Sequence, residues 1–296
     1  CTLFENICKL ELIKRLSLNN QINEVLTNDS FFYKSIVKNF DNKLIVRNKS
    51  SFVLKFYQIL KQNSIKLIAL FYNYTIRFLI PKLIVVKSSL YKNKPLIILE
   101  SIIYTNSFDN LIFNDRHYPG LLDHTTESEK LSIFILPYYY GIWNFFKLFK
   151  KLQKTNTNFV IPENFLKFSD YCYAFFSFFR LYKKTKNIKN IKINAYDVTD
   201  LVLDSYYKNI VSIGSCEGII RNRLIKRLKS KGVKIKKFIQ WFENQPINKG
   251  TIISLKTLYP KTKITGHIGF FTSPNVIGLY PSQQELDCDL LPDEVA

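Results

Sequence analysis

The feature that most constrains the fold of this chain is the alternation of short apolar runs with helical segments between residues 95 and 271. The apolar runs predict buried strands at 95–104, 131–136, 158–161, 233–242 and 264–271. Apolar residues at helical spacing predict helices over 142–154, 163–182, 197–209, 216–230 and from Pro246 onward. Strands that alternate with helices form βαβ units, so we expect an α/β fold with a Rossmann-like parallel sheet flanked by helices.

The composition supports a packed protein with an unusual charge. Of 296 residues, 47% are hydrophobic and 15% aromatic, which argues against general disorder. Lys and Arg outnumber Asp and Glu by 43 to 23. Two explanations of this excess stay open. One is codon drift in an AT-rich genome, which places Lys on a solvated surface, and the other is selection for an anionic partner. Five Cys without a CxxC pair and three isolated His predict free thiols in a reducing cytoplasm and no metal site.

The ends of the chain predict a fragment with three parts. The sequence contains no Met, begins at Cys1 and stops in an apolar stretch, so we expect both ends to be cut. We expect an N-terminal region over 1–94, a Rossmann-like domain over 95–290, and the start of a second domain over 291–296. The Lys- and Asn-rich segment 183–193 predicts an exposed linker.

Residues 51–86 are strongly apolar but carry several basic side chains. Lys66 and Arg77 enclose only ten residues, whereas a membrane-spanning helix needs about 20 apolar residues. We expect Pro81 to end the helix. Two interpretations stay open: a basic amphipathic helix over 51–80 on an anionic membrane surface, or a core helix whose Lys stems reach solvent.

A first polar cluster follows the predicted strand 95–104. Asp109, Asp115, Arg116 and His117 lie within nine positions of the chain. Arg can bind phosphate through two parallel hydrogen bonds, and Asp or His can take a proton from a sugar hydroxyl. The simpler alternative, which spacing alone favours, is that these residues only order the turns of a loop.

A second polar cluster, Glu243, Asn244 and Gln245, directly follows the predicted strand 233–242. The carboxylate can accept a proton or bind hydroxyls, and the amides both donate and accept. The equally weighted alternative is that Asn244 caps the helix that begins at Pro246. Ligands of open α/β sheets bind at the carboxyl ends of strands, so we expect Glu243 to line a groove near the Asp109–His117 loop.

Two weaker candidates complete the set. His267 lies between two glycines that permit close backbone approach, and it is a candidate base or hydroxyl ligand. A lone His in an apolar strand is more often structural. The small-residue segment 212–218, with Glu217, is a candidate anion-binding loop before a helix. It lacks the P-loop pattern, and a helix cap is the better explanation.

At these residues the chain resembles a family of bacterial surface-polysaccharide proteins, which are themselves similar to glycosyltransferases of the two-Rossmann (GT-B) type. The resemblance covers about residues 95–296. WFENQPINKG at 241–250 is its most specific part, and GHIG at 266–269 departs from the GYQG-like run expected there. The matching polar positions are Asp109, Asp115, Arg116, Glu217, Glu243, Asn244 and Gln245.

The resemblance implies one half of a GT-B architecture, with a second Rossmann-like domain beyond Ala296. It implies transfer of a sugar from a nucleotide-sugar donor to a glycan or lipid-linked acceptor, without a cofactor or a bound metal. Glu243 or Asp109 is the expected base, and Arg116 or segment 212–218 would bind anionic groups. The implied location is cytoplasmic, with peripheral binding to the inner membrane as an option.

Two other functions stay open on the residues alone. A basic module rich in aromatic side chains can bind nucleic acid by stacking and phosphate contacts, but no nucleic-acid-binding motif is present. The other is an assembly protein with an inactive transferase fold.

Overall fold

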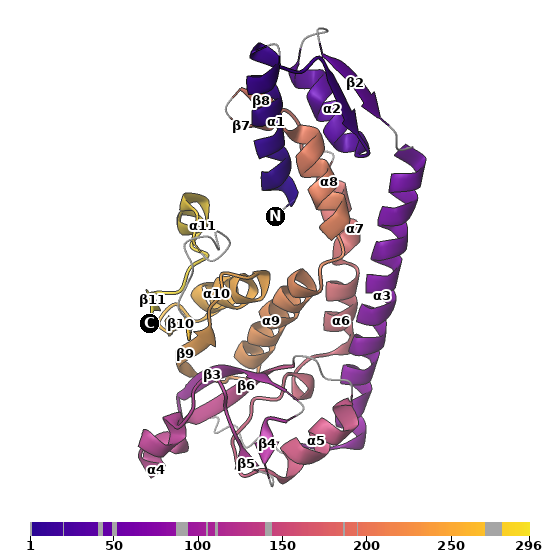
Figure 1. The fold of residues 1–296 in the computed structure, drawn as a ribbon. Helices are drawn as coiled ribbons and strands as arrows, with labels where there is room; N and C mark the ends of the chain where they lie inside the picture. Colours follow the sequence, from indigo (N-terminus) through magenta and orange to yellow (C-terminus); the bar gives the residue numbers. More distant parts are fainter. Residues whose placement is uncertain are drawn as a thin grey trace. The chain divides into compact units, whose positions relative to one another are not determined.

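In the computed structural model the chain forms two compact units (Figure 1). One contains Cys1–Leu70 and Phe176–Ser212, and the other contains Phe71–Phe175 and Ile213–Ala296. The structure describes residues 2–19, 21–40, 44–48, 52–86, 94–104, 106–109, 112–139, 144–185, 187–193, 195–269 and 280–296. The division differs from the expected boundary at residue 94, because segment 176–212 packs with the N-terminal region.

The first unit is built from helices and two short sheets. Helices α1 (Thr2–Leu18), α2 (Ser30–Asn39) and α8 (Thr199–Asn209) enclose a core that includes Leu10, Ile36 and Leu201. Helix α7 (Ser177–Thr185) belongs to the same unit. Strands β1 (Glu24–Thr27) and β2 (Ile45–Asn48) pair in parallel, and β7 (Lys192–Ile193) pairs antiparallel with β8 (Tyr196–Asp197). The expected linker 183–193 therefore includes the end of α7 and strand β7.

The second unit contains the predicted parallel sheet. Its five strands lie in the order β11-β10-β9-β3-β6, and all neighbours are parallel. They are β3 (Leu96–Ile103), β6 (Ile133–Tyr139), β9 (Ile235–Trp241), β10 (Lys263–His267) and β11 (Glu294–Val295). The Rossmann-like α/β class is thus confirmed. Residues 291–296, expected to begin a second domain, instead supply the edge strand β11. Phe159 in the expected strand 158–161 forms only an isolated bridge with Ile135.

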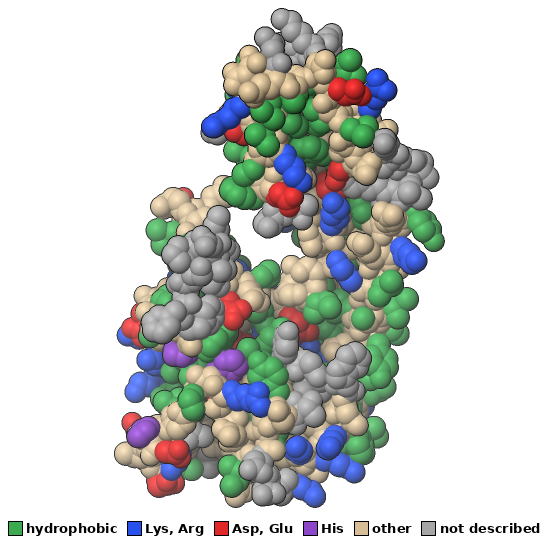
Figure 2. Space-filling view, in the orientation of Figure 1, with side chains coloured by type: hydrophobic (Ala, Val, Ile, Leu, Met, Phe, Trp, Pro, Cys, Tyr) green, Lys and Arg blue, Asp and Glu red, His purple; other side chains and the backbone are tan. Residues whose placement is uncertain are grey.

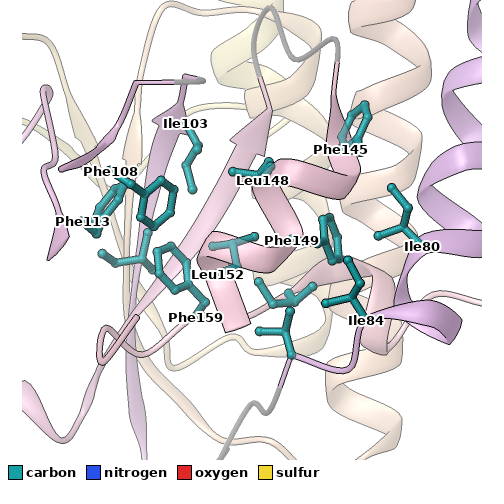
Figure 3. Packing of buried hydrophobic residues seen from close by; sticks show 13 residues of the cluster. Ile80, Ile84, Ile103, Phe108, Phe113, Phe145, Leu148, Phe149, Leu152 and Phe159 are labelled. Atoms are coloured by element: carbon teal, nitrogen blue, oxygen red, sulfur yellow. The ribbon is translucent and has the colours of Figure 1, made fainter. Parts of the chain in front are cut away.

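Helices and loops cover both faces of this sheet. One face packs on α5 (Phe145–Lys154), the end of α3 (Phe52–Leu83) and the hairpin of β4 (Phe108–Asp109) and β5 (Ile112–Phe113), around the apolar cluster in Figure 3. The other packs on α9 (Ile213–Ser230) and α10 (Pro246–Leu258). Shorter elements are η1 (Leu121–His124), α4 (Glu127–Lys130) and α11 (Gln283–Asp287).

Helices α9 and α10 cross with their backbones in contact. A Cβ placed on Gly250 would lie 2.0 Å from the carbonyl oxygen of Gly218, and one placed on Gly218 would lie 2.5 Å from that of Pro246. Only glycine permits such an approach. The expected loop 212–218 is therefore largely the first turns of α9, and Gly218 serves helix packing.

Local signals explain where other helices begin and end. Gly232 has a φ of +75° and follows α9, as predicted for a helix stop. The expected helix 163–182 is instead η2 (Pro162–Asn164), α6 (Phe168–Phe175) and α7. Asp170 accepts a hydrogen bond from the backbone N–H of Lys167 at 2.9 Å, which fixes the start of α6. The expectation that Pro81 ends α3 is wrong, since the helix continues to Leu83.

Candidate functional site

The order of the strands creates a switch point between β3 and β9. From β3 the chain moves to β6 on one side, and it later returns to place β9, β10 and β11 on the other. In open α/β sheets the crevice at the carboxyl ends of two such strands is where ligands bind. The carboxyl ends of β3 and β9 are therefore the place to look for a site.

A cavity of about 320 Å³ lies at this switch point. Residues of the carboxyl ends of β3, β6 and β9 and of the start of α10 surround it, and we call it the switch-point cleft. They are Glu100, Ile102, Tyr104, Tyr138, Trp241, Glu243, Gln245, Ile247 and Asn248. Glu243 and Gln245 thus lie where the sequence predicted. The aromatic walls and the polar groups suit a ligand with apolar faces and hydroxyl edges.

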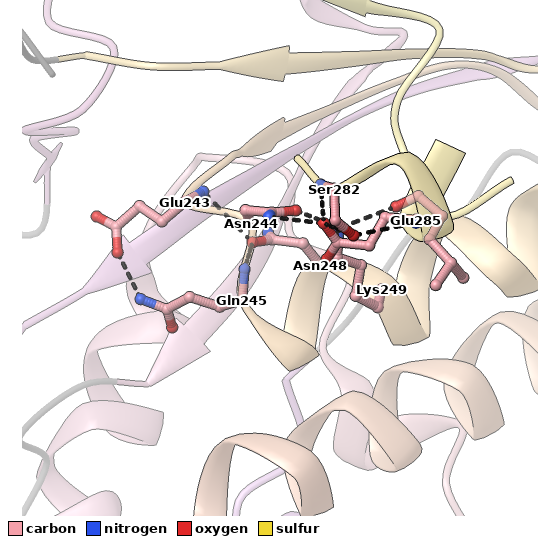
Figure 4. Close-up of polar contacts among 8 residues, drawn as sticks. Glu243, Asn244, Gln245, Asn248, Lys249, Ser282 and Glu285 are labelled. Atoms are coloured by element: carbon pink, nitrogen blue, oxygen red, sulfur yellow. Dashed lines mark hydrogen bonds and ion pairs between the residues drawn. The ribbon is translucent and has the colours of Figure 1, made fainter. Parts of the chain in front are cut away.

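Both carboxylate oxygens of Glu243 accept hydrogen bonds from neighbouring side chains. Oε1 lies 2.7 Å from Nε1 of Trp241. Oε2 lies 2.6 Å from Nε2 of Gln245 (Figure 4). These bonds fix the carboxylate against the indole ring at the mouth of the cleft.

The loop after β9 is held by Asn248 in the first turn of α10. Its Oδ1 accepts from the backbone N–H of Gln245 at 3.0 Å, and its Nδ2 donates to the carbonyl of Trp241 at 2.7 Å. Gln245 is the N-cap residue and Pro246 opens the helix. The alternative that Asn244 caps this helix is therefore not observed.

Asn244 is turned toward α11 rather than into the cleft. Its φ of +53° lies in the left-handed region, which Asn tolerates. Its Nδ2 donates to Glu285 at 3.2 Å, and its Oδ1 accepts from Lys249 (Figure 4). The backbone N–H of Ser282, followed by Lys249 and Asn244, lowers the pKa of Glu285 to about 2. Asn244 therefore connects α10 to α11 and does not line the cleft.

The loop after β5 reaches the same end of the sheet. Oδ1 of Asp115 accepts from the backbone N–H of His117 at 2.9 Å, as the loop-ordering alternative predicted. The His117 ring lies 4.2 Å from the Trp241 ring, edge to face. The Arg116 guanidinium lies 5.4 Å from the ring of Tyr104, which lines the cleft. Arg116 and His117 therefore each pack on an aromatic ring that lines the same cleft as Glu243.

The histidines pack on the rings beside the cleft. Burial lowers the pKa of His117, and the nearby Asp115 and Glu243 act in the opposite direction. The His267 ring lies 5.1 Å from that of Tyr118 and 5.8 Å from that of Trp241. A Cβ on Gly269 would lie 2.5 Å from the Trp241 ring, so the predicted close backbone approach is observed.

A second cavity, of about 420 Å³, is lined by Asp115, the predicted carboxylate of the loop after β5. Asn114, Asp115 and Tyr118 line it together with Leu99 of β3. Glu100 lines the switch-point cleft, and successive residues of a strand point to opposite faces of a sheet. Asp115 therefore lies at a different cavity from Glu243.

Glu217 is used in a buried ion cluster and does not line the switch-point cleft. Its Oε1 lies 2.7 Å from Nη1 of Arg77, whose Nε lies 2.8 Å from Oε1 of Glu163. The Tyr139 hydroxyl donates to the other oxygen of Glu163 at 2.8 Å. The expectation that Glu217 binds substrate is corrected accordingly. The side chain of Asp109, the other expected catalytic residue, lies outside the described part of the structure.

Sequence reasoning missed three polar residues beneath the cleft. Glu100, Arg221 and Gln240 are 3%, 3% and 0% exposed. Nη2 of Arg221 lies 3.2 Å from Oε1 of Glu100 and donates to the carbonyl of Pro137 at 2.7 Å. A Glu inside the apolar run PLIILESIIY and a Gln inside KFIQWF were the available signals, because buried strands seldom contain unpaired polar side chains.

Among the described residues, no group of three His, Cys, Asp or Glu side chains is arranged to hold a metal ion. Comparisons with known protein families, with functionally characterised proteins and with solved structures found no match to this chain. The site therefore has to be interpreted from its own geometry. That geometry provides two carboxylates, amides and aromatic rings around one cavity, which suits hydroxyl binding and proton transfer.

Proposed function

We propose that this chain is part of a glycosyltransferase of surface-polysaccharide biosynthesis, with a fold that corresponds to one half of a GT-B architecture. It transfers a sugar from a nucleotide-sugar donor to a glycan or lipid-linked acceptor, and the switch-point cleft binds the acceptor sugar. The observation that carries the proposal is the position of this cleft at the carboxyl ends of β3 and β9.

The chemistry of the cleft supports a sugar ring as the ligand. Tyr104, Tyr138 and Trp241 offer flat apolar surfaces, which match the C–H faces of a pyranose ring. Glu243 and Gln245 offer acceptors and donors for hydroxyl groups at its edge. We assign Arg116, which is exposed beside Tyr104, to binding anionic groups of the donor.

The surface of α3 supports a lipid-linked acceptor at an anionic membrane. None of the helices in the described part of the chain is long and apolar enough to cross a membrane. Within the second unit, Phe71, Tyr72, Leu79 and Leu83 of α3 are nevertheless exposed, and so is Lys82. Figure 2 shows hydrophobic and basic side chains together along this helix. Exposed apolar and basic residues on one helix favour peripheral binding to anionic lipid.

The proposal is tested by nucleotide release. The protein, expressed from its complete reading frame, is incubated with uridine, guanosine and thymidine diphosphate sugars and with CMP-sugars, with a bacterial lipid extract as acceptor. We expect one donor class to release its nucleotide and to label the lipid fraction. Release from none of them would refute the transferase function. Salt-dependent binding to nucleic acid without binding to anionic vesicles would favour the nucleic-acid module instead.

A cleft-blocking variant links the activity to this cavity. Ile102→Trp places a larger side chain in the cleft, and we expect it to abolish transfer while the thermal unfolding temperature stays close to that of the wild type. Leu131→Trp is the matched control, because Leu131 is exposed and does not line the cleft. Full activity of Ile102→Trp would show that the acceptor binds elsewhere.

A further inference from the structure

Glu100 lines the switch-point cleft, and it belongs to a group of three buried polar residues, with Arg221 and Gln240, that have unused hydrogen-bonding capacity. Within the described part of the chain, Oε1 of Glu100, Nε and Nη1 of Arg221 and both amide atoms of Gln240 have no hydrogen-bond partner. Leu99 pairs with Ile239 in parallel register, so Gln240 lies beside Glu100 on the same face. Buried polar groups are nearly always hydrogen-bonded, so three such residues together need an explanation.

Glu100 and Glu243 line the same cavity but differ in the hydrogen bonds that their carboxylate oxygens already accept. Both oxygens of Glu243 already accept hydrogen bonds from Trp241 and Gln245. Oε1 of Glu100 lies 3.2 Å from Nη2 of Arg221 but accepts no hydrogen bond from the described residues. The phenol of Tyr118 also interacts with the Glu100 charge, and its pKa is raised by burial and by that charge. A base must have a lone pair that can face the proton it removes, and Glu100 meets this requirement better than Glu243 does.

The surroundings of Glu100 also suit proton transfer near neutral pH. Burial raises the pKa of Glu100 above the usual value of a glutamate, and Arg221 partly opposes this effect. A carboxylate is a more effective base when its pKa is closer to the working pH. Arg221, anchored by the carbonyl of Pro137, would then stabilise the carboxylate form between turnovers.

We propose that Glu100, rather than Glu243, is the general base that deprotonates the acceptor hydroxyl in the switch-point cleft. This inference rests on the proposed transferase function. The acceptor oxygen forms a bond to the anomeric carbon of the nucleotide sugar, and its proton passes to a carboxylate oxygen of Glu100. The bond between the anomeric carbon and the phosphate oxygen breaks, and the nucleotide leaves with that electron pair. Glu243 then positions Trp241 and Gln245 at the mouth of the cleft.

The test compares isosteric variants in the nucleotide-release assay, with the donor and the lipid acceptor that the wild-type protein uses. We expect Glu100→Gln to lower kcat by about 100-fold or more, the usual contribution of a general base. Glu243→Gln should lower it less and change mainly the KM for the acceptor. Glu127→Gln, on the exposed helix α4, is the control and should match the wild type.

A pH profile separates a base from a structural residue. The wild-type rate should fall on acidification through an apparent pKa above the usual value of a glutamate, and Glu100→Gln should lose this limb of the profile. Glu100→Asp, which keeps a carboxylate in a shorter side chain, should recover part of the activity. Unfolding temperatures of both variants show whether they fold.

The outcomes distinguish the two proposals. Transfer by the wild type with an unchanged rate and pH profile in Glu100→Gln would overturn the role of Glu100 and leave the transferase function standing. It would indicate that bound water satisfies Glu100, Arg221 and Gln240. Loss of activity in Glu243→Gln, with the acidic limb retained in Glu100→Gln, would return the role of base to Glu243. No transfer by the wild type would overturn both proposals.

Discussion

The contact between α9 and α10 permits a sharp test of the fold around the cleft. Gly250→Ala adds one methyl group in the middle of α10. In an exposed helix this change stabilises by about 1 kcal/mol, because Ala has the higher helix propensity. Here the new Cβ would lie 2.0 Å from the carbonyl oxygen of Gly218, 2.5 Å from its carbonyl carbon and 2.8 Å from its Cα. Two opposing effects therefore have to be compared.

The clash should outweigh the helix propensity. All three neighbouring atoms belong to the backbone, so no side chain can rotate away and the two helices must separate. Forcing an extra methyl group into a packed interior costs about 1–3 kcal/mol, and more where the backbone must move. We expect a net loss of about 2 kcal/mol or more in the free energy of unfolding. That loss corresponds to a fall of about 4–8 °C in Tm for a unit of this size.

Thermal unfolding monitored by circular dichroism measures the effect. Gly218→Ala should also destabilise, since its Cβ would lie 2.5 Å from the carbonyl oxygen of Pro246. The double variant should lose less than the sum of the single losses, because one separation of the helices relieves both clashes. Thr257→Ala, exposed near the end of α10, is the control and should change little. An unchanged or higher Tm for Gly250→Ala would refute the close contact.

Three further predictions follow from other parts of the structure. Burial lowers the folded-state pKa of His117, so the stabilising contribution of this residue is present above about pH 6.5 and is lost as the pH falls toward the folded-state pKa. When Tm is measured from pH 7.5 to 5.5, it should therefore fall less in His117→Gln than in the wild type. Equal slopes of Tm against pH would contradict this prediction. Arg77→Met leaves Glu163 and Glu217 buried without their cation, and in a denaturant titration it should lower the free energy of unfolding by about 3–5 kcal/mol. The control Arg47→Met breaks an exposed pair with Glu24 and should change the free energy of unfolding by less than about 0.5 kcal/mol. Equal losses in the two variants would argue against the buried cluster. Vesicle flotation should show that the protein binds to anionic but not to neutral lipid, and that this binding is weaker at high salt. The double variant Leu79→Glu/Leu83→Glu should bind more weakly, whereas the control Leu131→Glu should bind like the wild type. Unchanged binding of the double variant would exclude this part of α3 as the membrane-binding surface.

The sheet could be predicted from the sequence because its signals are local. Runs such as PLIILESIIY and KFIQWF are too apolar to be solvated and too short for helices, and helical segments separate most of them. The position of Glu243 and Gln245 at a strand end followed from the same argument. The choice between function and helix capping for this cluster required coordinates, because Gln245 both caps α10 and lines the cleft.

The features that could not be predicted depend on contacts between distant parts of the chain. Glu217 resembled a residue of an anion-binding loop, but its partner Arg77 lies 140 positions earlier. Segment 176–212 belongs with the N-terminal region although the chain connects it to α6 and α9. Gly250 ended the most specific part of the family resemblance, yet its environment is the backbone of Gly218. None of these pairings leaves a periodic trace in the sequence.

A comparison of two buried polar groups shows why the cleft is the best candidate for function. Asp170 is fully buried, and its carboxylate accepts hydrogen bonds from Arg223, Arg227 and the backbone of Lys167. Burial of that charge is compensated, as expected where a buried ion serves stability. Glu100 is buried to a similar degree, but its Oε1 accepts no hydrogen bond from the described residues, and it lines a cavity at the switch point. An apolar residue at position 100 would fill the strand at lower cost, so the presence of a carboxylate there is better explained by a ligand than by the stability of the fold.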